Sequence, residues 1–487
     1  MRRYQIIAAR VRAAVAVSAV ALIPALAACG DAKDTLLEAV DPDIIPPAAA
    51  NSAEGALALY YGALGRLKTM SSGTGGEGST WLFGGLLADE WSTSSTFVQN
   101  DETDQRSIQL NNSTVTTMFR QLARARTSVR DALHYMRIWR ETETTRMAEL
   151  YFVKAFAEMT MASDFCNGIP LSSQDSSGTL IFDTPRTNAF VFEAAVASAD
   201  SGLALIPATA TGTQELLVRR ALLITKARAL LGLNKIAEAA ALVPASAVPT
   251  TYTYDLTYAT SSGDITLWAQ PRSSRRYTVG DSLEGRGRNL LVKNALPFFS
   301  GRLLKTDGTR VQDPRVPSTY TVSSSGDTTI SQDGLIPSRT TTLWGRSTTV
   351  SAVNGLDARL IEAEALLRAN DYAGMTAILQ ALRNTPPKLG DITPSFTGVT
   401  ALVAPTTLDA AINLYFREKA YWQFGRGYRL GDLRRLIRQY NRPQDQVFPV
   451  GAHYRGGSYG VDVNLPVPQA EENNPAFEGS ACIDRKA

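Results

Sequence analysis

A short stretch near the middle of the chain has the residue types of a serine hydrolase. Gly280-Asp281-Ser282-Leu283 spells a motif in which the serine hydroxyl attacks an ester, provided that a downstream Asp-x-x-His supplies the general base. The only later histidine is His453, and the residue three positions before it is Val450. Because a serine nucleophile depends on that base, we interpret the motif as part of a loop and expect no esterase site.

Aromatic residues in Ser-, Thr- and Gly-rich sequence suggest another chemistry, the recognition of sugars. A flat aromatic ring packs against the C–H face of a sugar ring, and nearby amide, carboxylate or guanidinium groups hydrogen-bond the hydroxyls. Asp264, Arg272 and Arg276 supply such groups close in sequence. The candidate ligand-binding residues are Trp81, Trp268, Tyr277 and Trp344. Packing in the core explains each of them equally well, and two tryptophans in helical stripes, Trp139 and Trp422, are assigned to the core.

The three cysteines have different expected roles. Leu26-Ala27-Ala28 before Cys29 resembles the lipobox of bacterial lipoproteins, in which the cysteine takes lipid on its sulfur and becomes the new N-terminus. An ordinary cleaved signal peptide with an accidental cysteine is the alternative. Cys166 and Cys482 remain as an even pair in an oxidising compartment, so we predict a disulfide, with two separate buried thiols as the alternative.

Metal binding and cofactors are not expected. The chain has only two histidines, His134 and His453, which lie far apart and have no Cys or carboxylate pairs at ligand spacing. We likewise expect no organic cofactor.

The first 28 residues have the pattern of a secretory signal peptide. Four arginines precede an uncharged run at 13–28 that is rich in Ala, Val and Leu and is too short to span a bilayer permanently. Residues 29–50 contain five acidic residues and Pro46-Pro47, and we predict that they form a lipidated tether. The expected product is an exported protein held to a membrane by acyl chains only.

The composition of the remaining chain is that of a globular protein. Of the 487 residues, 44% are hydrophobic and 20% are charged. The net charge is +3, and loss of the four signal arginines leaves −1, which argues against nucleic acid as a partner. We expect one domain at 51–487. It has a helical part at 51–245, a loop-rich excursion at 246–350, and a helical part with a wrapping tail at 351–487.

Apolar residues at helical spacing predict most of the elements that carry these side chains. In the first part the predicted helices are 53–67, 115–139, 145–164, 190–205 and a pair at 215–243. The arginines of the second pattern spread around the helix and are interpreted as a solvated face. They are Arg120, Arg124, Arg126, Arg130, Arg137 and Arg140.

A short internal repeat indicates how the helices pack. Residues 229–237 and 365–373 share the pattern A-L-L-x-x-N-x-[IY]-A, which resembles the turn between the two helices of a tetratricopeptide unit. Chance similarity of two helical hairpins is the alternative. Between these segments, alternation at 252–258 predicts a strand, and Ser325-Gly326-Asp327 predicts the turn of a hairpin. Loop-rich excursions on a helical scaffold are where binding surfaces are usually built.

Helical patterns return in the last third, at 356–369, 373–383 and 405–422. A final helix is predicted to begin with Asp432 as its N-cap. Its apolar stripe faces the core, and Arg434, Arg435 and Arg438 are interpreted as solvated charge on the other face.

Several segments, in order along the chain, resemble the signature of the SusD/RagB-like outer-membrane lipoproteins. They are Gly168-Ile169-Pro170-Leu171, Asp313-Pro314-Arg315, Phe416-Arg417-Glu418-Lys419, Gly427-Tyr428-Arg429, Asp432-Leu433-Arg434-Arg435 and Leu465-Pro466-Val467-Pro468-Gln469 with Asn473-Asn474-Pro475. Two departures separate the chain from the best-known starch-binding members. Gly425-Arg426-Gly427 replaces the usual acidic residue before Gly-His-Arg, and Tyr428 stands where histidine is common.

The resemblance implies a mostly α fold, with tetratricopeptide-like helix pairs and a loop-rich, partly β excursion that forms the ligand surface. It also implies a partner, a SusC-type TonB-dependent outer-membrane barrel, over which such a lipoprotein sits as a hinged lid that captures oligosaccharide or peptide. We therefore expect a non-enzymatic nutrient-binding lipoprotein on the exterior of the outer membrane. A lipid-anchored hydrolase of polysaccharide or ester, and a helical scaffold that binds other proteins, are the alternatives.

Overall fold

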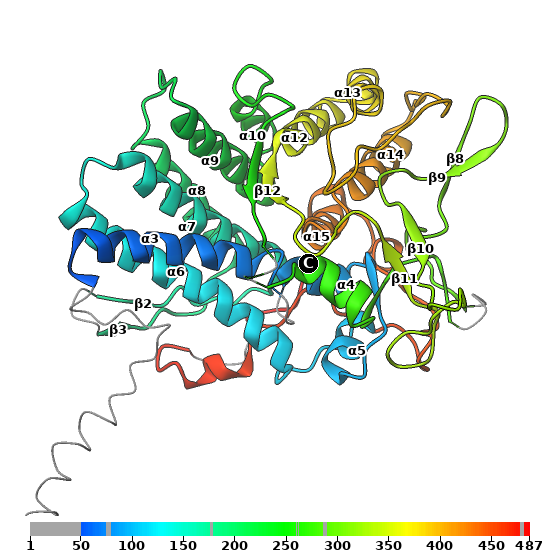
Figure 1. The fold of residues 1–487 in the computed structure, drawn as a ribbon, viewed down its shortest axis with the longest axis horizontal. Helices are drawn as coiled ribbons and strands as arrows, with labels where there is room; N and C mark the ends of the chain where they lie inside the picture. The colour runs from blue at the N-terminus through cyan, green and yellow to red at the C-terminus, as the bar shows by residue number, and fades with distance from the viewer. Residues whose placement is uncertain are drawn as a thin grey trace, which may run out of the picture.

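The computed structural model describes residues 50–74, 79–175, 179–259, 261, 263–285, 290–477 and 482–487. The predicted signal peptide, the tether up to residue 49 and the lipid site Cys29 lie outside these ranges. Helices form a stack on one side of the molecule, and loops with short β-ribbons cover the other (Figure 1). In the described ranges, every helix is too short or too polar to cross a membrane.

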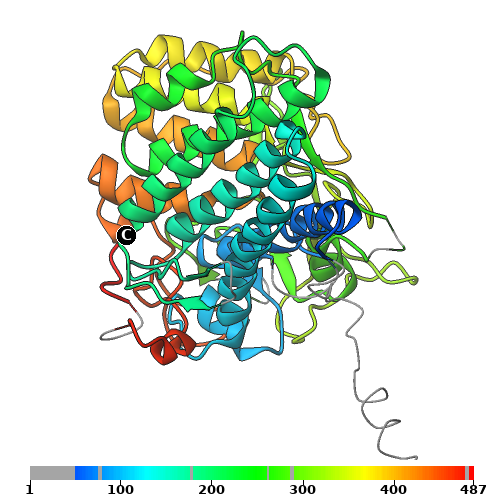
Figure 2. The ribbon, with the colours of Figure 1, turned by 90° about the vertical axis from the view of Figure 1, so that its left-hand side faces the viewer.

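Five of the first helices form a stack in which α3 packs against α6, α6 against α7, α7 against α8, and α8 against α9 (Figure 2). Helix α3 begins after Ser52, whose side chain accepts the Gly55 N–H at 2.9 Å and caps the first turn. The predicted helices of this part are confirmed to within a few residues at each end. The helices at 80–87 and 98–104 were not predicted, and the first of them contains Trp81, which the sequence placed in loop-rich sequence. The bounds are α3 Ala53–Met70, α4 Thr80–Leu87, α5 Val98–Asp104, α6 Ser113–Trp139, α7 Thr144–Asp164, α8 Asn188–Leu203, α9 Thr213–Gly232 and α10 Ile236–Leu242.

The repeated sequence pattern forms the same turn twice, between α9 and α10 and between α12 (Gly355–Arg368) and α13 (Tyr372–Asn384). Asn234 and Asn370 each adopt a left-handed backbone, with φ of 62° and 60°. In both turns the N–H after the asparagine bonds a carbonyl five residues back, and the asparagine N–H bonds one three residues back. This hydrogen-bond pair is the Schellman ending of a helix, so the repeat is a repeated helix hairpin.

Short antiparallel ribbons of two strands make up the β structure in the described residues. The pairs are β1 Trp91–Thr93 with β5 Tyr277–Val279, β2 Ser173–Gln174 with β3 Leu180–Ile181, β4 Thr253–Leu256 with β12 Val350–Asn354, β6 Leu283–Glu284 with β7 Leu290–Leu291, β8 Arg302–Leu304 with β9 Arg310–Gln312, and β10 Ser318–Tyr320 with β11 Arg339–Thr341. Short helical turns lie at α11 Thr266–Trp268, η2 Ala269–Ser273, η3 Gln444–Gln446 and η4 Gln469–Asn473.

Both β predictions find a counterpart in these ribbons. The alternating stretch at 252–258 contains β4, whose residues are alternately exposed and buried. The turn at Ser325-Gly326-Asp327 is present, but the paired segments beside it are reduced to the single bridge between Val322 and Thr328. The strand just before this turn, β10, pairs over three residues with β11, and the sequence did not indicate β11.

The last two helices, α14 (Leu408–Trp422) and α15 (Arg429–Tyr440), correct two predictions. Asp432 lies inside the first turn of α15 and is not its N-cap. Arg434 and Arg435 are buried, although the polar face of the helix suggested solvated charge. Arg434 donates to the carbonyl oxygens of Ala162, Ser163 and Phe165, at the end of α7. A cation there satisfies carbonyls that the helix itself leaves unpaired.

Signature residues from distant segments meet in buried ion pairs. Arg315 contacts Asp313 at 2.6 Å and Glu418 at 2.8 Å, and Arg383 also pairs with Glu418. Burial alone would raise the pKa of the Glu418 carboxyl, but Arg315 and Arg383 hold that pKa below its usual value. The ion pairs of Arg315 therefore connect the loop-rich region, through the Asp313-Pro314-Arg315 turn, to Glu418 of α14 in the helical part.

A disulfide joins Cys166, just after α7, to Cys482 near the C-terminus, with the two Cα atoms 5.9 Å apart. This is the pair that the sequence predicts. The tail also pairs with the same segment through the backbone, because the Cys166 N–H donates to the Leu465 carbonyl at 2.9 Å. The described parts of the tail, 451–477 and 482–487, thus wrap across the end of α7, as expected from their Gly-, Pro- and Asn-rich sequence.

Candidate functional site

A cavity of about 290 Å³ opens where the helical stack meets the loop-rich region. The end of α14, the β4–β12 ribbon and the segments 343–344 and 388–390 enclose it. Its lining residues are Thr253, Asp255, Arg315, Leu343, Trp344, Thr349, Val350, Ser351, Asn354, Lys388, Leu389, Gly390, Tyr421, Trp422, Phe424 and Arg426. Aromatic residues from α14 and from the excursion therefore share one cavity.

The cavity floor is built around Trp344, which is 6% exposed. Its ring stacks on Phe424, with centroids 6.3 Å apart and planes 16° apart. Gly425 makes room for the indole, because a Cβ there would lie 2.5 Å from the ring and the φ of +69° also favours glycine. The Gly425 N–H donates to the carboxylate of Glu90 at 3.0 Å. Burial raises the pKa of Glu90 to about 8.

The cavity mouth is polar. Thr253 and Asp255 point outward from β4, and Thr349 and Lys388 are exposed on the facing segments. Asp255 also accepts a hydrogen bond from the Ser351 hydroxyl at 2.8 Å. A carboxylate, an ammonium group and hydroxyls thus surround an aromatic floor. This combination of groups is suited to a small polyhydroxylated ligand.

Two buried donors among the lining residues have no hydrogen-bond partner in the described part of the chain: the indole N–H of Trp422 and the Nε–H of Arg426. The other guanidinium nitrogens of Arg426 bind the Asp357 carboxylate at 2.9 and 3.0 Å. Buried donors are normally paired with protein, water or ligand. Trp422 is buried, as the sequence predicts, but it also lines the cavity, which the helical stripe did not reveal.

Trp268 lies on the segment next to Trp344. The Ile265 N–H donates to the Arg346 carbonyl at 3.0 Å, which brings the two segments side by side. The guanidinium of Arg346 lies 5.6 Å from the centre of the half-buried Trp268 ring and pairs with Asp264 at 3.0 Å. Two of the four predicted aromatics, with the predicted Asp264, are therefore in neighbouring segments of the excursion.

The other two predicted aromatics lie in the core. Trp81 and Tyr277 are each 2% exposed, so neither ring offers a face to a ligand in this structure. Trp81 packs on Gly427, where a Cβ would lie 2.2 Å from the indole, and Tyr277 belongs to the β1–β5 ribbon. Trp139 contradicts its assignment to the core, because it is exposed at the end of α6.

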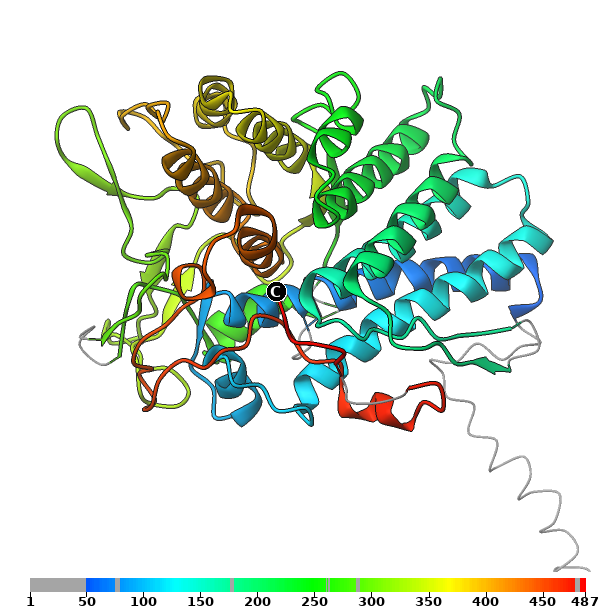
Figure 3. The ribbon, with the colours of Figure 1, turned by 180° about the vertical axis from the view of Figure 1, so that it is seen from behind.

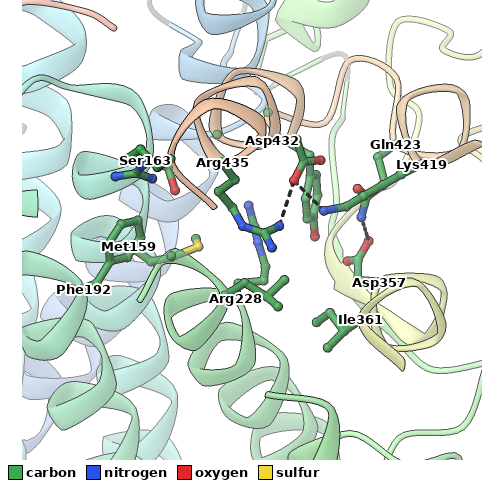
Figure 4. A pocket seen from close by; sticks show the side chains of 16 residues that line it. Met159, Ser163, Phe192, Arg228, Asp357, Ile361, Lys419, Gln423, Asp432 and Arg435 are labelled. Atoms are coloured by element: carbon green, nitrogen blue, oxygen red, sulfur yellow. Dashed lines mark hydrogen bonds and ion pairs between the residues drawn. The ribbon is translucent and has the colours of Figure 1, made fainter. Parts of the chain in front are cut away.

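A second, much smaller crevice of about 40 Å³ lies between α9, α12, α14 and α15. Figure 4 shows its charged side chains directed at one another. Lys419 contacts Asp432 at 2.6 Å, Arg435 contacts Asp432 at 3.3 Å, and Gln423 donates to Asp357 at 2.9 Å. A space of this size holds little more than water, so these signature residues stabilise the fold.

Among the described residues, Ser282 of the serine motif has no hydrogen bond to a histidine. Nε2 of His453 lies 3.2 Å from Asp104, and its Nδ1 lies 3.2 Å from the Gln105 amide. Both ring nitrogens are thus engaged away from Ser282. Among the described residues, no three His, Cys, Asp or Glu side chains are grouped so that they could hold a metal ion.

The molecule belongs to the class of mostly α proteins in which helix pairs support a region of loops and short β-ribbons. Comparison with solved structures shows which fold this is. A SusD superfamily protein from Parabacteroides distasonis is 13% identical, and the match covers 88% of this chain and 99% of that one at a TM-score of 0.58. A SusD-like carbohydrate-binding protein from Bacteroides fragilis is 12% identical, over 88% and 98% of the two chains, also at 0.58. A SusD superfamily protein from Bacteroides vulgatus is 13% identical, over 87% and 98%, at 0.56.

The chain therefore has the SusD-like fold, which confirms the mostly α architecture that the resemblance implied. No protein-family model and no curated protein matches the sequence. At 11–14% identity the similarity is carried by three-dimensional structure.

Proposed function

We propose that this protein is a non-enzymatic lipoprotein that captures an oligosaccharide and delivers it to a SusC-type TonB-dependent barrel. Acylation of Cys29 would hold it on the exterior of the outer membrane. The SusD-like fold supports this role, because two of its structural neighbours are described as carbohydrate-binding proteins. The barrel as partner and the lipid anchor follow from the sequence resemblance and the lipobox.

The observation that carries the proposal is the cavity with Trp344 in its floor. An aromatic floor and a polar mouth supply the stacking and the hydrogen bonding that a sugar ring needs. A volume of about 290 Å³ is at the small end of small-molecule sites, which span roughly 300–1,000 Å³. The cavity thus suits the end of an oligosaccharide better than the middle of a polymer, with Trp268 as a further contact outside it.

Calorimetric titration of the full mature chain with a panel of oligosaccharides tests the capture step. Trp344→Ala should weaken binding at least tenfold, since truncation of a buried aromatic anchor costs about 2 kcal/mol or more and about 1.4 kcal/mol corresponds to tenfold. Asp255→Asn, on the exposed mouth, should also weaken binding without affecting folding. Trp139→Ala, at a distant exposed site, is the matched control and should bind like the wild type.

Three outcomes would contradict parts of this proposal. Wild-type affinity in both cavity variants would place the ligand elsewhere, and the absence of binding to any sugar would remove the ligand class. Turnover of a glycan, abolished by a single Asp or Glu substitution, would show a hydrolase instead. Hydrolysis is therefore assayed with the same panel and the same protein.

The partner is tested by purifying the lipidated protein from outer membranes in mild detergent. A TonB-dependent barrel should co-purify in near-equal amount. Recovery of the lipoprotein alone would contradict the transport role, while leaving sugar binding by the cavity unaffected.

A further inference from the structure

A basic groove lies far from the cavity, between α6, α7 and the segment that leads into β2. Its volume is about 380 Å³. Arg126, Arg130 and Arg137 line it from α6, and Lys154 and Tyr151 line it from α7. The sequence pattern of these arginines indicates a solvated helix face, but the structure gathers three of them with a lysine in one concavity.

The groove has more positive than negative charge. Arg126 and Lys154 share one carboxylate, Glu158, at 3.1 and 3.7 Å, and Arg130 pairs with Asp131 at 2.5 Å. The Arg137 guanidinium donates to the uncharged Tyr151 hydroxyl at 2.7 Å. In addition, Nη1 of Arg130 has no hydrogen-bond partner within the described residues. Four cations facing two carboxylates make this a site for an anionic group.

Exposed apolar side chains border the groove on two sides. Ile138 and Trp139 follow Arg137 directly at the end of α6. Strand β3 pairs with β2, which lines the groove, and continues into an apolar run. The border residues Ile138, Trp139, Leu180, Ile181 and Phe182 are 44–55% exposed. We call the groove together with this apolar border the tether face.

The described chain begins on the same face. The Trp139 indole donates to the Asn51 side chain at 3.0 Å, and Arg140 donates to the Ala53 carbonyl at 2.7 Å. Figures 1 and 3 show the start of α3, the end of α6 and the β2–β3 ribbon together at one end of the molecule. About 20 residues separate this point from Cys29.

We propose that the tether face lies on the lipid surface, with phosphate headgroups in the basic groove and Trp139 and its apolar neighbours at the headgroup level. Tryptophan and tyrosine favour membrane interfaces, and arginine can keep its charge at the phosphates while its stem lies among apolar groups. Basic residues near an anionic surface add attraction that salt screens. The proposal rests on the lipid anchor of the proposed function, but not on sugar capture.

Vesicle flotation of the full mature chain carrying Cys29→Ser tests the surface without the acyl chains. Vesicles of phosphatidylethanolamine with phosphatidylglycerol should bind the protein, and phosphatidylcholine vesicles should bind it at least fivefold less. High salt should reduce the difference. Arg130→Ala combined with Arg137→Ala, and separately Trp139→Ser, should each lower binding to anionic vesicles at least threefold.

The matched controls are Arg310→Ala and Val403→Ser, which change exposed residues outside the tether face and should leave vesicle binding unchanged. Equal losses in controls and tether-face variants, or no binding of the wild type to anionic vesicles, would overturn the proposal. If the tether-face variants bind vesicles normally but no longer co-purify the barrel, the face is a protein interface and the proposal is wrong. Sugar titration of the same variants should match the wild type, which keeps this test separate from that of the cavity.

Discussion

The signature residues of α14 and α15 act through buried charge pairs, and Glu364 is the centre of one of them. Its carboxylate accepts hydrogen bonds from Tyr415 at 3.0 Å, Tyr440 at 2.7 Å and Arg435 at 3.1 Å. Burial alone would raise the pKa of Glu364, but Arg435 and Lys419 lower it to about 2. Because the pKa in the folded state lies below its value in the unfolded chain, ionised Glu364 stabilises the native structure.

Glu364→Gln should therefore destabilise the protein in a pH-dependent way. The contribution of the ionised carboxylate is complete above about pH 5 and is lost as the pH falls toward 2. At pH 7 the loss should be about 3 kcal/mol, from a shift of roughly two pKa units and from the buried Arg435, which keeps only the ion pair with Asp432 at 3.3 Å. Urea unfolding at a series of pH values measures the free energy of unfolding. The exposed Glu193→Gln is the control, and an equal deficit at pH 3 and pH 7 would refute the linkage.

The sequence pattern of α15 correctly placed its arginines on the face opposite the apolar stripe. It wrongly predicted that Arg434 and Arg435 are exposed to solvent, since both are buried. A helical period shows which residues share a face, and it does not show what covers that face. The carboxylate that pairs with Arg435 is 71 positions away in the chain, and the carbonyls that Arg434 binds belong to α7. Signature residues of this kind could be recognised by resemblance, but their burial required the fold.

At the scale of elements, the repeated turn is the clearest link from sequence to structure. A left-handed backbone costs an ordinary residue roughly 1–2 kcal/mol, and asparagine tolerates it better because its side chain bonds locally. The A-L-L-x-x-N pattern therefore predicted both helix hairpins, and the positions of Asn234 and Asn370 explain why the pattern repeats.

Asn370→Ala should lower the free energy of unfolding by about 1 kcal/mol, whereas Asn370→Gly should be neutral or stabilising. The reason is the φ of 60° at this position, which glycine adopts freely and alanine does not. Thermal unfolding followed by circular dichroism measures the difference. Asn384→Ala, at the end of α13, removes the same side chain from a helical backbone and should cost little. Equal changes in the free energy of unfolding for Asn370→Ala and Asn370→Gly would mean that tolerance of the left-handed backbone is not the contribution of Asn370.

The cavity shows what the sequence could not assemble. Trp344 and Trp268 were identified because they are aromatic residues in loop-rich sequence, but Trp81 and Tyr277 met the same criterion and lie in the core. Asp255, Lys388 and Trp422 were missed because they come from a strand, a loop and a helix end that only the fold brings together. Asp255 had one usable signal, its outward position in the alternating stretch at 252–258.

At the scale of the whole molecule, the two proposed surfaces lie at different places. The cavity adjoins β12 and the end of α14, whereas the tether face includes the β2–β3 ribbon at the end where α3 begins (Figure 1). Contact of the tether face with lipid would therefore leave the cavity mouth accessible.

The disulfide is the one covalent link between the helical stack and the C-terminal tail in the described residues, and it spans 316 positions. A cross-link over so long a loop restricts the unfolded chain strongly, so its removal typically costs about 2–5 kcal/mol. Hydrogen bonds also hold the tail against the segment after α7, since the Ile483 N–H donates to the Asn167 carbonyl at 2.8 Å and the Asn167 amide donates to the Asp484 carboxylate at 3.1 Å. Loss of the link should thus destabilise the fold without releasing the tail under native conditions.

The parent protein for this test is the chain with Cys29→Ser. Adding Cys166→Ala and Cys482→Ala to it should lower the urea midpoint by an amount that corresponds to about 2–5 kcal/mol. Reductant should bring the parent protein down to the midpoint of this variant and leave the variant itself unchanged. Because Cys166 is fully buried and Cys482 is nearly so, the reductant should act in the unfolding transition and have little effect on the native protein. Two results together would show that Cys166 and Cys482 are not bonded. The urea midpoint of the parent protein would not change with reductant, and thiol labelling in denaturant would detect free thiols at both positions.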